Sequence, residues 1–137
     1  MRPIHYIVLH CTATSQKATV ESIQRYWKEN LGWESPGYHY LIKPDGTAVN
    51  LLSIEHPSNG VKGYNKYSIH ISYIGGIDAK GKALDNRTPA QLATMEKLVR
   101  QFKAQFPGAK ILGHRDFPGV AKSCPSFDVK SWVASLK

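Results

Sequence analysis

The sequence is poor in cysteine, in acidic residues and in long apolar stretches. Of its 137 residues only two are cysteines, Cys11 and Cys124. They could form at most one disulfide, and a disulfide is less common in a cytosolic protein than in a secreted one. No apolar run approaches the roughly 18 residues that a membrane-spanning helix needs, and the mean hydropathy is −0.35. We therefore expect no membrane insertion.

The N-terminal segment lacks the features of a secretion signal. Its apolar residues run from Ile4 to Leu9, and His5, His10 and Cys11 leave this stretch too short and too polar for the apolar region of a signal peptide. We expect the chain to be cytoplasmic as synthesised and to act on targets outside only if something else releases it.

Acidic residues are few relative to basic ones. The 10 Asp and Glu residues against 18 Lys and Arg residues give a net charge of +8. Such a surface attracts polyanions, including nucleic acid, anionic lipid and the acidic cell wall of bacteria, or is simply a solvated basic surface. The sequence has no Lys/Arg run and no repeated aromatic platform, so we expect no nucleic-acid partner.

No internal repeat, low-complexity segment or interdomain linker divides the chain. A chain of this length can bury about two-thirds of the surface that it exposes when unfolded, which is enough for one core. We expect residues 1–137 to form a single domain and the protein to be a monomer.

Apolar periodicity predicts the order β-α-β-β-β-α-β-α. Strands are expected at residues 4–10, 38–43, 47–52, 68–75 and 110–113, and helices at residues 19–31, 88–106 and 128–136. Thr88 and Gln91 predict a capping box at the second helix, and the aromatic residues of the first helix are expected in the core. This order predicts an α/β fold, a single domain with a mixed central β-sheet flanked by helices.

Two histidines, His10 and His114, stand where a strand is expected to end, and Cys124 follows ten residues after His114. Ligands and metals collect at the C-terminal ends of strands in α/β sheets, so these side chains can meet there. Two imidazoles and one thiolate suit Zn²⁺ and leave its fourth position open for water. This arrangement is typical of a hydrolase rather than of a structural metal site.

Two neighbours of these residues have different expected roles. Lys122 lies two residues before Cys124 and can face the same cavity, where an ammonium favours an anion or a polarised carbonyl. Cys11 should point away from His10 along the strand, and a small buried apolar residue is a better interpretation of it than a ligand.

Nine short segments carry a family resemblance. They are Val8–Thr14, Gly37–Tyr40, Lys43–Thr47, Lys62–Asn65, Ser68–Ile69, Gly75–Asp78, Thr88–Gln91, Gly113–Asp116 and Lys122–Asp128. In this order they resemble the zinc-dependent N-acetylmuramoyl-L-alanine amidases of the bacteriophage T7 lysozyme type, which are related to peptidoglycan recognition proteins. Each segment is weak alone, but the set spans nearly the whole chain and is specific.

The resemblance implies a function and a site. His10, His114 and Cys124 fall on the family's zinc ligands. Tyr38 falls on the tyrosine that faces the metal, and Lys122 on the lysine that assists catalysis without binding zinc. The implied protein is a zinc hydrolase that cuts the amide between N-acetylmuramic acid and L-alanine in peptidoglycan, as in cell-wall lysis by an endolysin.

The chain departs from the family pattern around Asn65. Where the family often has a His-Ala-Gly-like stretch before this residue, the chain has Gly60–Gly63, and His70 occupies a place where small residues are common. His56 is a candidate for the role of the missing histidine. Thr12, His56 and Asn65 are the candidate substrate-binding residues, and we expect the departures to affect substrate contacts more than the metal site.

Other functions compete with cell-wall lysis. A cytosolic amidase that recycles muropeptides would also lack a secretion signal. A peptidoglycan-binding module without catalysis would typically lack the cysteine ligand, which is present here as Cys124. In each of these alternatives the partner is peptidoglycan or a muropeptide.

Overall fold

The computed structural model describes residues 2–120 and 122–136. Their elements follow the predicted order, with short 3₁₀ turns η1 and η2 added before β4 and after β5. The bounds are β1 Tyr6–Cys11, α1 Val20–Glu29, β2 Tyr40–Ile42, β3 Ala48–Asn50, η1 Asn65–Tyr67, β4 Ser68–Tyr73, α2 Pro89–Gln105, β5 Lys110–Gly113, η2 His114–Asp116 and α3 Val129–Ser135.

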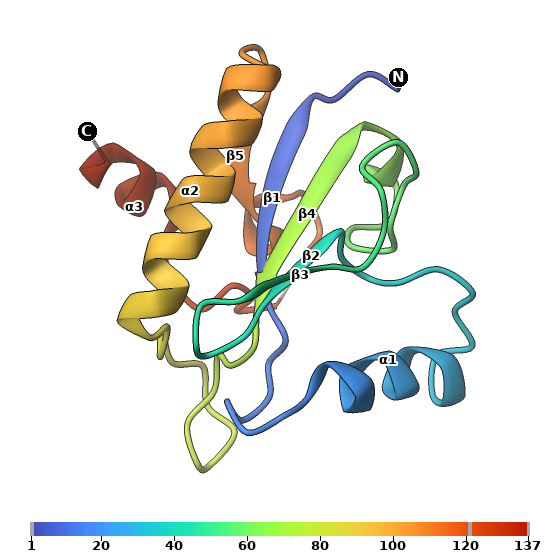
Figure 1. Cartoon of the computed structure of the whole chain (residues 1–137), viewed down its shortest axis with the longest axis vertical. Helices are drawn as coiled ribbons and strands as arrows, with labels where there is room; N and C mark the ends of the chain where they lie inside the picture. Colours follow the sequence, from blue (N-terminus) through green and yellow to red (C-terminus); the bar gives the residue numbers. More distant parts are fainter. Residues whose placement is uncertain (1, 121, 137) are drawn as a thin grey trace.

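The described strands form one five-stranded sheet in the order β3-β2-β4-β1-β5. β1 pairs in parallel with both β4 and β5, β2 pairs in parallel with β4, and β2 and β3 form an antiparallel hairpin at one edge. Figure 1 shows α2 and α3 together on one side of the sheet and α1 on the other. The predicted mixed sheet flanked by helices is confirmed.

Alternation along β1 divides its side chains between the two faces of the sheet. Ile7, Leu9 and Cys11 join the core that packs against α2 and α3. Val8 belongs to a separate cluster on the opposite face, so His10 is directed to that face as well. Cys11 is the buried core residue that the sequence predicted.

The helices begin where the sequence predicts. Thr88 caps α2 by accepting from the backbone N–H of Gln91, whose side chain accepts from the N–H of Thr88 in return. Thr19 caps α1 with a matching pair of hydrogen bonds to Ser22. Among the described helices, none combines the length and the apolar character that crossing a membrane would take.

Several elements are shorter than predicted. The hairpin strands β2 and β3 each comprise three residues, and α1 ends at Glu29. Residues 38 and 39 lie outside β2. The backbone of His39 nevertheless bonds to both neighbouring segments, since its N–H donates to the carbonyl of His70 at 2.9 Å and its carbonyl accepts from the N–H of Leu51 at 2.8 Å. The segment that leads into β2 is thereby held beside β4, and Tyr38 lines the cavity from it.

Candidate metal centre and active site

Three side chains that could ligate a metal ion meet at the C-terminal ends of two adjacent parallel strands. His10 is the penultimate residue of β1, His114 directly follows β5, and Cys124 returns in the loop after η2. The candidate ligand atoms of these residues all lie within 4.8 Å of one another. The sequence placed His10 and His114 at strand ends, and the pairing of β1 with β5 brings those two ends together.

Backbone hydrogen bonds hold the returning loop against the strand ends. The N–H of Cys11 donates to Sγ of Cys124 across 3.2 Å, and the N–H of Arg115 donates to the carbonyl of Cys124 across 2.9 Å. Asp116 accepts from the N–H of Gly113 at 2.8 Å and so fixes the turn that carries His114. The cluster therefore depends on the loop as well as on the sheet.

The donor set fits a zinc ion. Nδ1 of His10 lies 3.9 Å from Sγ of Cys124. A tetrahedral zinc, with bonds of about 2.0 Å to nitrogen and about 2.3 Å to sulfur, separates its ligand atoms by roughly 3.3 to 3.6 Å. The three candidate atoms, which lie within 4.8 Å of one another, are thus somewhat farther apart than the ligands of a bound zinc ion. Two nitrogens and one sulfur also match the ligand preference of zinc.

The electrostatic environment keeps the two histidines neutral. Burial, followed by the nearby His70 and His114, holds the pKa of His10 well below its usual range. Burial and then Lys122 lower the pKa of His114. Neutral imidazoles carry the lone pair that a metal needs.

The thiol of Cys124 keeps its proton until a cation arrives. The side-chain hydrogen bond between the two thiols, and then burial, raise the pKa of Cys124, and they outweigh the backbone N–H of Cys11, which lowers it. A metal ion must therefore displace a proton when it binds.

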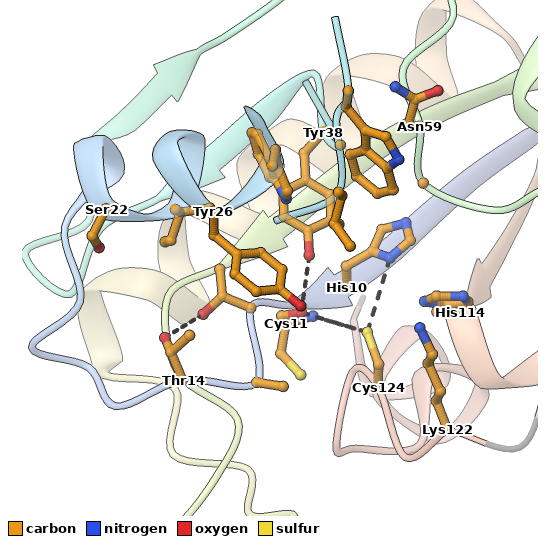
Figure 2. Close-up of a pocket in the computed structure, with 18 residues that line it drawn as sticks. His10, Cys11, Thr14, Ser22, Tyr26, Tyr38, Asn59, His114, Lys122 and Cys124 are labelled. Atoms are coloured by element: carbon orange, nitrogen blue, oxygen red, sulfur yellow. Dashed lines mark hydrogen bonds between the residues drawn. The ribbon is translucent and has the colours of Figure 1, made fainter. Parts of the chain in front are cut away.

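The cluster lies at the floor of a cavity of about 650 Å³. Figure 2 shows His10, His114 and Cys124 on one side of this cavity, with Lys122 rising beside His114 and Cys124. Lys122 is exposed and belongs to the cavity lining, as does Thr12. The cavity thus combines possible metal ligands with an exposed cationic side chain in its lining.

Tyr38 lines the same cavity from the segment before β2. Its ring lies 5.0 Å from the ring of His10 and meets Trp27 edge-on at 5.4 Å. Gly37 permits this packing, because a Cβ there would lie 3.1 Å from the Trp27 ring. The hydroxyl of Tyr38 donates to the carbonyl of Cys11 at 3.2 Å (Figure 2). Burial raises the pKa of Tyr38, so the group remains a phenol.

Two of the three candidate substrate-binding residues, His56 and Asn65, are not among the residues that line the cavity. His56 is exposed, and its carbonyl accepts a hydrogen bond from Nε2 of His39 at 2.7 Å. Asn65 is half-buried, and its Oδ1 accepts from the N–H of Val61 and from Nε2 of His70, each at 2.8 Å. Of the three predicted substrate-binding residues, Thr12 alone is among the described residues that line the cavity.

Sequence reasoning missed two kinds of residue at this site. Tyr26 of α1 was expected in the core, yet it is 52% exposed and lines the cavity, whereas Trp27 is 7% exposed. The spacing of Ile23 and Trp27 defines the buried face of α1 and turns Tyr26 away from it. His70 was also missed, although alternation along β4 places it on the same face of the sheet as His10.

The fold and the site together define a hydrolase of the α/β class with a possible His/His/Cys metal centre. A family model described as N-acetylmuramoyl-L-alanine amidase matches residues 1–127. The chain belongs to this family. Its enzymatic activity is accordingly that of an N-acetylmuramoyl-L-alanine amidase acting on peptidoglycan, which confirms the activity that the sequence resemblance implied.

Individual relatives agree with this assignment. The chain is 41% identical to the endolysin of Escherichia phage T7 over 128 residues, which cover 92% of this chain and 83% of the relative. It is 39% identical to the endolysin of Klebsiella phage KP32 over 127 residues, with 92% and 83% covered. The endolysin of the Thermus scotoductus bacteriophage Ph2119 has a similar structure, with a TM-score of 0.83, 28% identity, and 98% of this chain and 84% of that chain covered.

Proposed function

We propose that His10, His114 and Cys124 hold one zinc ion, and that the site hydrolyses the amide between N-acetylmuramic acid and L-alanine. The observation that carries this proposal is the convergence of the three ligand atoms within 4.8 Å at the floor of the cavity. When bound there, zinc supplies a Lewis acid for the amide carbonyl and lowers the pKa of water toward about 7.

Lys122 stabilises the negative charge that develops on the carbonyl oxygen during hydrolysis. Its ammonium approaches the cavity from the rim beside His114 and Cys124 (Figure 2). Because the side chain of Lys122 is exposed, it can reorient toward a bound substrate. Its charge stabilises the oxyanion most strongly once the bound glycan excludes water from the site. Its role is separate from metal binding, because an ammonium has no lone pair to offer a cation.

Tyr38 is the second donor in the site. Burial keeps its phenol protonated, and its hydroxyl faces the cavity floor beside His10. Rotation of the O–H bond away from the Cys11 carbonyl lets it donate to the substrate oxygen or to the departing amine.

Thr12 is the predicted substrate-binding residue that the cavity geometry favours. Its hydroxyl lies 2.7 Å from that of Thr14 and accepts from the N–H of Gly75 at 3.0 Å, which fixes its orientation on the cavity wall. The exposed ring of Tyr26 offers an apolar face on the side of α1. Sugar rings and peptide backbone both bind to such combinations of hydroxyl and aromatic surface.

The cell wall is the proposed site of action after release of a chain made in the cytoplasm. The net charge of +8 favours approach to an anionic wall. We propose that the protein acts as a monomer, since the ligands and donors of the site all come from one chain.

Mass spectrometry of digested peptidoglycan tests the reaction. The zinc-loaded protein should release stem peptides with free L-alanine N-termini and leave the glycan strands intact, and a Cys124→Ala variant should release none. New reducing sugar ends, or binding to the wall without cleavage, would contradict the proposal. Comparison of intact sacculi with soluble muropeptides then distinguishes wall lysis from recycling, with faster cleavage of sacculi expected.

A further inference from the structure

A chain of hydrogen bonds runs from a loop backbone to the candidate ligand His10. It begins at Val61, whose N–H lies 2.8 Å from Oδ1 of Asn65. A backbone N–H can only donate, so the amide atom that it meets is the oxygen. Nε2 of His70 lies 2.8 Å from the same oxygen. Since that oxygen can only accept, Nε2 of His70 carries a proton.

The tautomer of His70 determines the tautomer of His10. His70 is fully buried, and a neutral imidazole protonated at Nε2 has a lone pair at Nδ1. That Nδ1 lies 2.8 Å from Nε2 of His10. Nε2 of His10 must therefore be the donor, which leaves the lone pair of His10 at Nδ1. This is the nitrogen that lies 3.9 Å from Sγ of Cys124.

We propose that Asn65 and His70 are positioning residues, which hold His10 in the tautomer and orientation that present Nδ1 to the metal. The inference rests on the proposed ligand role of His10. Metal-bound histidines commonly donate their second ring N–H to an acceptor that fixes the ring. Here that acceptor is a second histidine, and an asparagine amide oriented by the Val61 backbone sets its protonation.

The surroundings of His70 hold its ring in this position. Its backbone N–H donates to Nδ1 of His39 at 3.0 Å, and the two imidazole rings lie parallel at 6.0 Å. On the other side, Gly60 leaves the space that the ring occupies, because a Cβ at residue 60 would lie 2.3 Å from Nδ1 of His70. Gly60 also lines the cavity, so the His70 ring lies directly behind the cavity wall.

The two sequence departures are therefore linked in space. The sequence has glycine at position 60 and a histidine at position 70, where small residues are common in the family it resembles. The structure places these two residues in contact and directs the histidine at His10. The proposal therefore extends the expected effect of these departures from substrate contacts to the metal site in the case of His70.

The tautomer of His10 can be measured directly in the unmodified, metal-free protein. Long-range ¹H–¹⁵N spectra of the imidazoles distinguish a protonated nitrogen from an unprotonated one. We expect His10 and His70 both to be protonated at Nε2 and unprotonated at Nδ1. A His10 protonated at Nδ1 would overturn the proposal without any variant being needed.

Two substitutions at one position test whether the alignment matters for the metal. Asn65→Leu removes the acceptor, whereas Asn65→Asp keeps an oxygen for both Val61 and His70. We expect Asn65→Leu to weaken zinc binding by about 10- to 100-fold in chelator competition and to mix the His10 tautomers. Asn65→Asp should retain parental affinity to within a few-fold and a single tautomer.

Two further substitutions, His70→Phe and Gly60→Ala, change the His70 ring itself or its position. His70→Phe keeps a ring of similar size but removes both nitrogens, and Gly60→Ala displaces the ring without altering a polar group. Both should weaken zinc binding as Asn65→Leu does. Parental zinc affinity in folded Asn65→Leu and His70→Phe proteins would overturn the proposal. A parent protein that binds no zinc would instead contradict the proposed function, while the tautomer measurement would still test the hydrogen-bond chain.

Discussion

The backbone N–H of Cys11 donates to Sγ of Cys124 across 3.2 Å, so the two cysteines of the chain meet through backbone and side chain. Their side chains have different surroundings. Both residues contribute to the cavity lining, but Cys11 is 3% exposed and belongs to the core beneath α2 and α3, whereas Cys124 is half-buried and is the one grouped with His10 and His114. We therefore expect Cys11 to matter for stability and Cys124 for the metal.

Replacing each cysteine should separate these two roles. Cys124→Ala removes a proposed ligand, so we expect the zinc content of the purified protein to fall from about one per chain to near zero, with loss of activity. Cys11→Ala should cost about 1–2 kcal/mol of unfolding free energy from lost packing and should retain zinc. Metal analysis after dialysis and urea denaturation measure both effects. Full zinc content in Cys124→Ala would exclude this residue as a ligand.

Lys122→Met should leave zinc binding intact and remove turnover. Loss of one donor to a developing oxyanion lowers kcat by about 10²- to 10³-fold, and the apolar replacement has a similar length. Lys130→Met is the matched control, because Lys130 is exposed on α3 and is not among the residues that line the cavity. Steady-state rates with a soluble muropeptide give the comparison. Equal kcat values in the two variants would show that Lys122 is only a surface charge.

Tyr38→Phe removes a hydroxyl and leaves the ring in place. We expect kcat to fall by about 10²-fold while zinc content is retained, because a proton donor is lost. The unfolding free energy should fall by only about 1 kcal/mol, the usual net value of one hydrogen bond. Tyr40→Phe is the control, since Tyr40 packs against Phe102 at 5.7 Å on the other side of the sheet. An unchanged kcat in Tyr38→Phe would limit its hydroxyl to the contact with Cys11.

The stability of the metal-free protein should fall on acidification through the range in which free histidine titrates. Burial, opposed by the His56 carbonyl and helped by Arg2, lowers the pKa of His39 to about 4 from an ordinary 6.5. The unfolded chain therefore binds more protons between these values, and stability is fully present above pH 6.5 and is lost toward pH 4. His39 alone contributes about 3 kcal/mol to this loss.

Urea denaturation at several pH values, in the presence of a chelator, measures this dependence. His10 and His70 should also lower the stability on acidification, because burial holds the pKa of each well below its usual range. His39→Asn keeps an acceptor for the His70 N–H but cannot titrate. Between pH 4 and 6.5 the variant should take up about one proton fewer on unfolding than the parent, so its unfolding free energy should depend less steeply on pH. An identical pH dependence in both proteins would show that His39 is not buried as a neutral group.

Much of the fold and part of the site follow from sequence. Thr88 and Gln91 predict the start of α2 because the capping box is a local device. His10 and His114 are placed at strand ends by local periodicity, and the parallel-sheet rule then brings them together. Cys124 and Lys122 follow from the family resemblance together with proximity in sequence.

The remaining site residues depend on contacts that no local pattern encodes. His70 reaches His10 only because β4 pairs with β1 in the observed register. Asn65 was expected at the substrate, but its amide oxygen is taken by His70 and Val61 once η1 forms. Tyr26 lines the cavity because the chain after α1 folds back over the site, which the helical periodicity of α1 does not determine.

The two ends of the candidate centre are far apart in the chain, since His10 and Cys124 are separated by 114 positions. Their contact requires β5 to have paired with β1 and the following loop to have closed. A nascent chain that has exposed only β1 to α2 holds one of the three ligands. Such a chain lacks two of the three proposed ligands, so on this proposal a metal ion can be captured only after the last strand and the loop that follows it have joined the fold.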